Sequence, residues 1–387
     1  MIHASGVFTT IIILAISVFL IREGSSIFNK YKIETGYAVV VSNENPITEL
    51  NSEQLRKINT AEIETWDKLG WEPTKIEILT LESLEDKFSA EELGKRYENA
   101  ETVIYEYINS HPNVIGIFPK RFLDPKLTRV KLEKVTLFSL LFRNHWYPNS
   151  NPFPDFGAAA IIYGSLYVSI LAMIIAVPIG LIVAVFLAEI ATSRIHKFQK
   201  FFIELLAGIP SVILGLFGLV YVVPTIKLTF NLDRGETVLA GGIVLAIISL
   251  PSLISLSEDA LRSVNKEVKE ASLALGATKL QTIIRISLPM ARSGIFSAII
   301  LSAGRAFGET MAVLMVTGNS TLFSVSPLES VRTITGTIAS ELGESPVGSL
   351  HYESLFILGS ILFFITFFFN LIASAIMGMD HAAKIKN

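Results

Sequence analysis

The stretch "EASLALGATKLQTIIRISLP" (Glu270–Pro289) lies between two apolar runs and predicts a helix-turn-helix. Small Ala271 and Ser272 allow a partner to approach closely, and Gly276 can take the left-handed conformation that ends a helix. A second helix follows, and we expect Pro289 to separate it from the next apolar run. The pattern indicates a docking element that projects from its surroundings. The alternative is an ordinary amphipathic connector.

The composition around this stretch is that of a membrane protein with a water-soluble part. Of 387 residues, 51% are hydrophobic and 17% are charged, which is too apolar for an ordinary soluble chain and too charged for one wholly in lipid. The formal net charge is −3, which offers no basic surface for nucleic acid. The absence of cysteine excludes disulfides, thiolate metal sites and a cysteine nucleophile.

Six apolar runs predict membrane-spanning helices. The first lacks a basic start and a signal-peptide cleavage site, so it is interpreted as a retained helix. The six runs are Val7–Ile21, Ala158–Ala188, Phe201–Val223, Ala240–Leu256, Ser293–Thr317 and Leu355–Met377. The sequence therefore predicts an all-α polytopic membrane protein with six spans.

Lysine and arginine residues set the expected orientation. They gather near Arg194–Lys200, in the loop Arg262–Arg292 and in the tail at Lys384 and Lys386. These three segments fall on one side, which the positive-inside rule assigns to the cytoplasm. Both termini are then cytoplasmic, and the segment after the first span is extracytoplasmic. Basic residues between positions 22 and 32 favour the opposite orientation but are outnumbered.

The polar segment 28–135 is expected to form an α/β lobe. Short buried strands are predicted at Tyr37–Ser42, Lys75–Thr80 and Val114–Phe118. An amphipathic helix is predicted at Ser89–His111, which opens with a serine cap and an acidic first turn. Strands that alternate with helices favour an α/β unit.

Charged residues occur inside the fifth apolar run. Arg305 and Glu309 are four residues apart, so they are expected to share one helix face, where they could pair. Each costs about 2.5–3.5 kcal/mol near the middle of a bilayer. Gly304 and Gly308 would let a neighbouring helix pack closely. Either the charges form a structural ion pair, or Arg305 faces a transported anion, to which a guanidinium fork is well matched.

Other motifs narrow the chemistry. Pro210 removes a helix hydrogen bond and is expected to kink the third span, either for gating or as a packing bend. The sequence has no P-loop, so any ATP hydrolysis must come from a partner. The six histidines show no metal-ligand spacing and there is no nucleophile motif, so neither a catalytic nor a metal site is predicted.

The helix-turn-helix resembles the loop of ABC-importer permeases, which carries Glu-Ala-Ala, then Gly, then Ile-x-Leu-Pro at the spacing found here. Ser272 stands for the second alanine of the family pattern. The resemblance implies a type I importer permease fold and a loop that docks on an ATPase subunit. The residues that match the pattern are Glu270, Ala271, Ser272, Gly276, Ile286, Leu288 and Pro289.

Three further stretches resemble the PstC-type permease of bacterial phosphate importers. They are "GRAFGETMAVLMVTGN" (Gly304–Asn319), "AGIPSVILGLFGL" (Ala207–Leu219) and the run Ile162–Ile190. The resemblance implies a phosphate path with Arg305, Glu309 and Thr310. Sulfate and molybdate permeases share a shorter Arg-x-x-Gly-Glu pattern, so another oxyanion is the alternative. The continuation from Thr310 favours phosphate.

Permeases of this type usually have only a short connection after the first span, so the lobe at 28–135 is an insertion. Asn43–Gly70 and His111–Asp124 resemble parts of periplasmic phosphate-binding proteins, which implies one degenerate lobe of such a protein. Where that family has a phosphate cradle, this chain has the acidic stretch Leu79–Glu92, and carboxylates oppose an anion. A docking or structural role is therefore expected.

The expected organisation follows. It comprises a first transmembrane helix (1–27), the lobe (28–135), a connector (136–156), a permease core with five helices and coupling loop 258–292 (157–380), and a cytoplasmic tail (381–387). The resemblance implies a PstA-type second permease, ATPase subunits that use ATP and Mg²⁺, and an extracytoplasmic phosphate-binding protein as partners in a prokaryotic cytoplasmic membrane. The chain itself is expected to bind no cofactor and to be no enzyme. A membrane phosphate sensor is the rival function.

Overall fold

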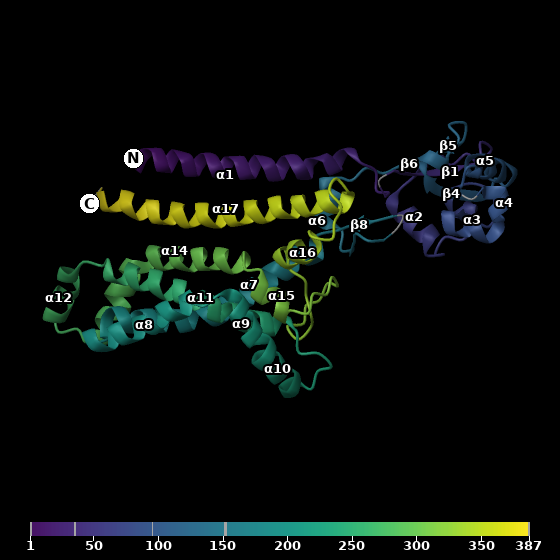
Figure 1. Ribbon diagram of the computed structural model, residues 1–387. Coiled ribbons are helices and arrows are strands. Elements are labelled where there is room, and N and C mark those ends of the chain that lie inside the picture. The colour runs from purple at the N-terminus through teal and green to yellow at the C-terminus, as the bar shows by residue number, and fades with distance from the viewer. Residues whose placement is uncertain (1, 35, 95, 151–152, 386–387) are drawn as a thin grey trace. The chain divides into compact units, whose positions relative to one another are not determined.

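The computed structural model describes residues 2–34, 36–94, 96–150 and 153–385 (Figure 1). The chain divides into two compact units. The membrane unit comprises residues 1–20, 158–344 and 355–387, and the lobe comprises residues 21–157 and 345–354. The lobe is thus larger than the expected segment 28–135. It takes in the end of the expected first helix, the expected connector, and residues 345–354, which include the start of the last long helix.

Six helices in the described residues are long and apolar enough to cross a membrane, as predicted. The spans are Val7–Asn29, Ala159–Ile190, Ser211–Phe230, Val238–Arg262, Lys279–Phe307 and Leu350–Ile376. Their main helices are α1 (Ile2–Ser25), α7 (Ala159–Val185), α9 (Ser211–Phe217), α10 (Val223–Phe230), α11 (Val238–Arg262), α14 (Leu288–Phe307) and α17 (Leu350–Ile385). Long apolar runs favour helices here because a helix satisfies every backbone polar group within itself.

The core of the membrane unit lies around α11, which packs between α7 and α14. Small residues make this close packing possible. A Cβ atom at Gly241 of α11 would lie 2.6 Å from the Thr317 side chain and 3.1 Å from Val168 of α7. The position therefore requires glycine, and α11 is the helix against which the other spans are placed.

The third apolar run is two helices, which corrects the predicted kinked span Phe201–Val223. Helix α8 (Ser193–Gly208) ends before Pro210, and α9 begins directly after it. Ile209 and Pro210 have ψ values of 127° and 135°, outside the helical range. A proline disfavours helical backbone in the residue before it, so the chain breaks here. The span continues from α9 through the π turn η5 (Gly218–Val222) into α10.

The fifth apolar run is also divided. Helix α14 ends at Phe307, residues 308–310 are not helical, and α15 (Met311–Val316) follows. The expected span Ser293–Thr317 is therefore wrong at its end, where Gly308 interrupts the helix.

At the other end of this run, Pro289 does not separate the loop from the span. Helix α13 (Lys279–Thr282), the π turn η6 (Ile283–Ser287) and α14 form one span. Pro289 stands in the first turn of α14. Because the helix is continuous there, Pro289 lies inside the span, just after a π turn where the regular hydrogen-bond ladder is already altered.

The first and last spans pack against each other in the membrane unit. The rings of Phe19 and Phe356 are 5.6 Å apart at 83°, an edge-to-face contact. Helix α17 also contacts α14, because the Ser297 hydroxyl donates to the Ala373 carbonyl at 3.1 Å. Figure 1 shows α1, α17 and α14 side by side.

The lobe contains a four-stranded sheet in the order β3-β4-β1-β5. The strands are β1 (Tyr37–Val41), β3 (Glu77–Leu79), β4 (Val114–Pro119) and β5 (Thr128–Arg129). Strand β1 is antiparallel to β4 and β5, and β3 is parallel to β4. Three of these strands lie where the sequence predicts them. Two small sheets pair β2 (Glu49–Leu50) with β6 (Lys131–Leu132), and β7 (Trp146–Tyr147) with β8 (Asp155–Phe156).

Alternating side chains of β1 enter two apolar cores. Val39 and Val41 pack with Trp66 on one face of the sheet, and Val40 packs with Ile104 on the other. The helices of the lobe are α2 (Ser52–Asn59), α3 (Leu81–Lys87), α4 (Ala90–Leu93), α5 (Ala100–Ser110) and α6 (Leu137–Phe142). The lobe therefore has buried cores of its own.

The single helix expected at Ser89–His111 is two helices, α4 and α5. Ser89 caps α4, as predicted, and forms a reciprocal capping box with Glu92. The helix then ends at Gly94, whose φ is +79°, and Tyr97 has a φ of +62°. Two positive φ values cannot be accommodated in a right-handed helix, so the chain restarts at α5.

Candidate functional site

A cavity of about 160 Å³ lies in the membrane unit beside the end of α14. Its ionisable lining residues are Arg305 and Glu309. The other walls come from the break between α8 and α9 and from α11, through Leu206, Ala207, Ile209, Ser211, Leu214, Ile248 and Pro251. The Pro210 break and the Gly308 interruption thus border the same space, so two helix ends define the candidate path.

Arg305 is oriented by α11. It lies in the last turn of α14, and its Nη1 donates to the Ser252 Oγ at 2.7 Å. Within the described residues, no ion pair joins it to Glu309, which corrects the expected pairing on one helix face. The helix ends at Phe307, so Glu309 has left the helical path that a spacing of four residues assumes.

Glu309 and Thr310 form the non-helical link to α15. The Glu309 carbonyl accepts from the Thr335 hydroxyl at 2.8 Å, which ties the link to α16 (Ile334–Glu341). The Thr310 hydroxyl donates within the link to the Gly308 carbonyl at 3.5 Å. Glu309 is partly buried and Arg305 is exposed. The cavity therefore has one oriented cation and one carboxylate that are not paired with each other.

The two glycines beside these charges have different surroundings. A Cβ atom at Gly304 would lie 3.2 Å from Phe369 Cβ, so α17 approaches α14 closely there. A Cβ atom at Gly308 would meet only carbonyl groups of its own helix, at 3.7 Å. Gly308 therefore serves the helix break and not the expected contact with a neighbouring helix.

The cavity can hold a small anion. Its volume equals that of about five waters at roughly 30 Å³ each. A guanidinium has five N–H donors, and one hydrogen bond to Ser252 leaves the others free to bind oxygen atoms. Such a site favours an oxyanion over a neutral solute.

A buried ionic cluster, which the sequence analysis missed, fixes the wall of this cavity. The Glu258 side chain is only 3% exposed and accepts from His196 Nε2 at 2.7 Å, Lys200 Nζ at 3.0 Å and Arg262 Nε at 2.8 Å. His196 and Lys200 belong to α8, whose other end lines the cavity. In the sequence, the only indication of the cluster is that His196 and Lys200, and likewise Glu258 and Arg262, are four residues apart and so share a helix face. The cluster fastens α8 to α11.

The coupling loop has the predicted turn. Helix α12 (Lys266–Ala274) ends before Gly276, whose φ of +87° requires glycine-like backbone, and α13 follows. The Ser272 and Thr282 hydroxyls are 3.0 Å apart and join α12 to α13. Glu270 pairs with Lys266 at 3.3 Å, and Ala271 is exposed.

The remaining matched residues do not project. Ile286 and Leu288 are partly buried in η6 and α14, while Pro289 is exposed in the span. Three leucine side chains of the loop do project into the surroundings. The sequence did not indicate them, because it does not show which apolar side chains are left uncovered in the fold. Leu273, Leu275 and Leu280 are exposed by 46%, 91% and 63%.

An ion pair ties helix α12 to the spans. Lys269 Nζ lies 2.7 Å from Glu189 in the π turn η4 (Phe186–Ile190), and it also donates to the Leu261 carbonyl at 3.1 Å. Both residues are mostly buried. A movement of α12 would therefore act on the ends of the second and fourth spans.

The family model of the binding-protein-dependent transport system inner membrane component matches residues 176–379. This range contains the cavity, the coupling loop and the Glu258 cluster. The chain belongs to this family. Its members are ABC-importer permeases of the inner membrane and are not themselves enzymes, so the predicted class of polytopic α-helical permease is confirmed.

Relatives agree with this assignment. The probable ABC transporter permease protein YqgH of Bacillus subtilis is 39% identical over 59% of this chain and 74% of its own. The phosphate transport system permease protein PstC of Mesorhizobium japonicum is 36% identical over 61% of this chain and 77% of its own. One solved structure, an inward-facing MetNI methionine ABC transporter, is 21% identical with a TM-score of 0.43 over 55% of this chain and 93% of that chain. The matches to PstC sequences confirm the predicted resemblance to PstC-type permeases.

Proposed function

We propose that this permease is a subunit of an ATP-driven importer of inorganic phosphate, and that Arg305 binds the anion in the translocation path. The observation that supports this most directly is the oriented guanidinium in a cavity of about 160 Å³. Relatives named as phosphate permeases favour phosphate as the anion. Glu309, on the same cavity, would keep the anion from being held too tightly for release.

The proposed importer contains a second permease of the PstA type, ATPase subunits that use ATP and Mg²⁺, and an extracytoplasmic phosphate-binding protein. The lysine and arginine distribution supports an orientation with both termini in the cytoplasm and the lobe outside. Residues 386 and 387 at the C-terminal end lie outside the described residues. In this orientation α12 and Gly276 face the ATPase, and the lobe faces the binding protein.

Docking on the ATPase would use the exposed surface of α12. Ala271 allows close approach, and Leu275, which is 91% exposed, offers an apolar contact. The ion pair of Lys269 and Glu189 would carry the movement of α12 to the spans. The Glu258 cluster would extend it to α8 and hence to the cavity wall.

Uptake by the assembled importer in proteoliposomes tests the proposal. ATP-dependent accumulation of labelled phosphate is expected, and Arg305→Gln should reduce it at least tenfold at unchanged complex yield. Arg234→Gln, which removes an exposed arginine from the loop before α11, is the matched control. Full uptake by Arg305→Gln contradicts the role of Arg305. Preferential uptake of sulfate or molybdate contradicts phosphate, and ligand-dependent signalling without flux indicates a sensor.

A further inference from the structure

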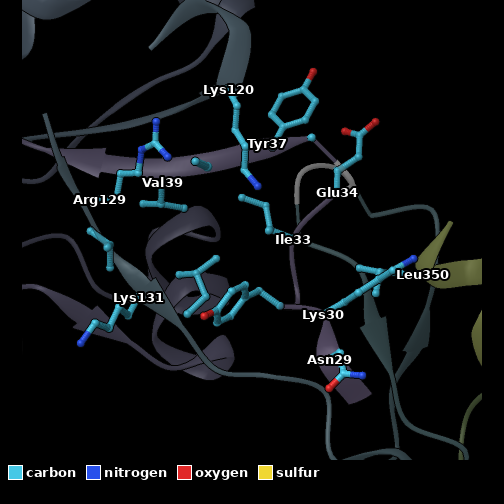
Figure 2. Close-up of a pocket in the computed structure, with 15 residues that line it drawn as sticks. Asn29, Lys30, Ile33, Glu34, Tyr37, Val39, Lys120, Arg129, Lys131 and Leu350 are labelled. Carbon is cyan, nitrogen blue, oxygen red and sulfur yellow. The ribbon is translucent and has the colours of Figure 1, made fainter. Parts of the chain in front are cut away.

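A second cavity, of about 510 Å³, lies in the lobe (Figure 2). Its size is that of pockets that bind small molecules. Apolar side chains make up much of the wall, including Ile33, Val39, Val130 and Leu132. Four cations and a single carboxylate, that of Glu34, also line it; the cations are Lys30, Lys120, Arg129 and Lys131. The cavity combines an apolar wall with an excess of positive charge.

Two of the four cations are engaged elsewhere. Lys30 Nζ lies 2.7 Å from Glu353, and Lys131 Nζ lies 3.4 Å from Glu49. In contrast, neither Lys120 nor Arg129 has a side-chain partner among the residues that the structure describes. Figure 2 shows Lys120 extending toward Ile33, whereas the amine of Lys131 points away. Lys120 and Arg129 are the cations available to a ligand.

Both side chains are held by the sheet. Arg129 lies in β5, opposite Val40 of β1, and the next residue donates to the Val39 carbonyl at 2.9 Å. Lys120 directly follows β4, and its backbone N–H donates to the Gly36 carbonyl at 2.7 Å. The two cations therefore flank β1 from its two neighbouring strands. A site built on strands is more rigid than one on free loops.

The cavity lies where two spans enter the lobe. Asn29, the last residue of the first span, and Leu350, the first residue of the last span, both line it. The Lys30 carbonyl accepts from the Val135 N–H at 3.1 Å, and α6 begins two residues later. Helix α6 exposes three apolar side chains; Leu137, Phe138 and Phe142 are 51%, 72% and 65% exposed. Exposed apolar groups beside the end of a span are typical of a membrane interface.

We propose that this cavity binds a phosphate group, as part of an anionic lipid headgroup or as the free ion, through Lys120 and Arg129. Arginine offers paired donors to phosphate oxygens and lysine a compact charge. The apolar wall and the adjacent span ends favour the lipid, whose glycerol and acyl parts need apolar surface. This site is separate from Arg305 and does not depend on the transported substrate.

Two binding measurements on the full chain separate the sources. Native mass spectrometry of the detergent-purified protein counts retained phosphatidylglycerol against phosphatidylcholine. Equilibrium dialysis with labelled inorganic phosphate measures the free ion. The test variant is Lys120→Gln/Arg129→Gln. The control, Arg121→Gln/Lys126→Gln, removes the same charge from exposed positions of the lobe that do not line the cavity.

We expect the wild type and the control to retain phosphatidylglycerol selectively, and the test variant to bind it about tenfold more weakly. If the test variant alone loses phosphate binding in dialysis, and none of the three proteins prefers phosphatidylglycerol, the free ion is the ligand. Equal binding of both probes by all three proteins overturns the proposal. So does an equal loss in the test variant and the control.

Folding of the test variant can be checked directly. All three tryptophans, Trp66, Trp71 and Trp146, belong to the lobe, so their fluorescence reports its fold in the full chain. If the double variant is misfolded, Arg129→Gln and Arg129→Lys replace it. The first should weaken binding and the second should retain most of it, because the charge is kept. Identical binding by these two variants and the wild type overturns the assignment.

Discussion

The guanidinium of Arg305 donates to the hydroxyl of Ser252 at 2.7 Å, across the contact between α14 and α11. No ion pair with Glu309 competes for it in the described part of the chain. Because α11 is the central helix of the membrane unit, the position of the cation is set by the packed core of that unit. A hydroxyl orients the guanidinium without neutralising it, which leaves its charge for an anion.

Replacing Ser252 with alanine should therefore lower phosphate uptake without affecting assembly. A hydrogen bond that involves a charged group contributes about 1.5–3 kcal/mol, so a reduction of about tenfold to a hundredfold is expected. Uptake and complex yield should be measured together. Ser263→Ala is the control, since the Ser263 hydroxyl bonds only within its own turn of the chain, to the Ala260 carbonyl. Unchanged uptake in Ser252→Ala would show that Arg305 needs no orientation from α11.

The Glu258 cluster should dominate the stability of the membrane unit. Glu258→Ala leaves His196, Lys200 and Arg262 without their shared carboxylate, and breaking a buried ionic cluster costs about 3–5 kcal/mol. The melting temperature of the purified protein in detergent measures this. Glu267→Ala, at an exposed carboxylate, should have little effect. Similar melting temperatures for the two variants would contradict the role of the cluster.

Because of Lys32, the free energy of unfolding of the lobe should change with pH in the alkaline range. It is 2% exposed and its amine has no hydrogen bond in the described structure. Burial, and next the charge of Arg143, lower its pKa from 10.5, against the opposing effects of Glu133 and Asp155. Between the lowered pKa and 10.5 the unfolded lobe binds more protons than the folded lobe, so the free energy of unfolding rises with pH.

This dependence should disappear in Lys32→Met, which should also be more stable than the wild type at neutral pH. Urea unfolding of the full chain, followed by tryptophan fluorescence at several pH values up to about 10, measures it. Lys68→Met, at an exposed position of the lobe, should keep the dependence. An unchanged pH profile in Lys32→Met would show that another group titrates.

The coupling loop should be sensitive to backbone shape at Gly276. A valine there must adopt a φ of +87°, and left-handed backbone costs an L-residue roughly 1–2 kcal/mol. We expect Gly276→Val, and also Ala271→Leu, to reduce co-purification of the ATPase while membrane insertion is unchanged. Gly343→Val is the control, because that glycine has open space around it and no positive φ. Normal co-purification in both test variants would contradict the docking role.

The lobe should be removable without loss of the spans. Tyr31 and Lys134 pair in an antiparallel bridge, so a short flexible linker can replace Ile33–Lys134 without separating the ends. We expect normal insertion, because each span is apolar by itself, and weaker recruitment of the phosphate-binding protein. Protease protection measures insertion and pull-down measures recruitment. Failure of the shortened chain to insert would show that the lobe is needed for membrane assembly.

Sequence patterns predicted the features that depend on local chemistry. Hydropathy located six spans because lipid demands long apolar runs, and Gly276 marked a left-handed turn because few other residues adopt one. The strands at Tyr37–Val41 and Val114–Pro119 were visible as β-branched apolar runs. Each of these features is decided by residues that are neighbours in the chain.

The features that were missed or wrong depend on contacts between distant segments. Nothing near Glu258 in the sequence indicates His196, and nothing near Arg305 indicates Ser252. The end of α14 at Phe307 was missed because the apolar run resumes at Met311, so Gly308 was interpreted as a packing residue within one continuous helix. Hydropathy shows whether a segment can lie in an apolar environment, but it does not show where the helix ends.

The edge-to-face contact of Phe19 with Phe356 joins the first and the last of the six spans in the described residues. More than three hundred residues separate them, so the ribosome must make almost the whole chain before α1 meets α17. Until then, the first helix waits in the bilayer without its final neighbour. Synthesis of α17 is therefore required for this contact, and a nascent chain halted before α17 would leave Phe19 without its aromatic partner.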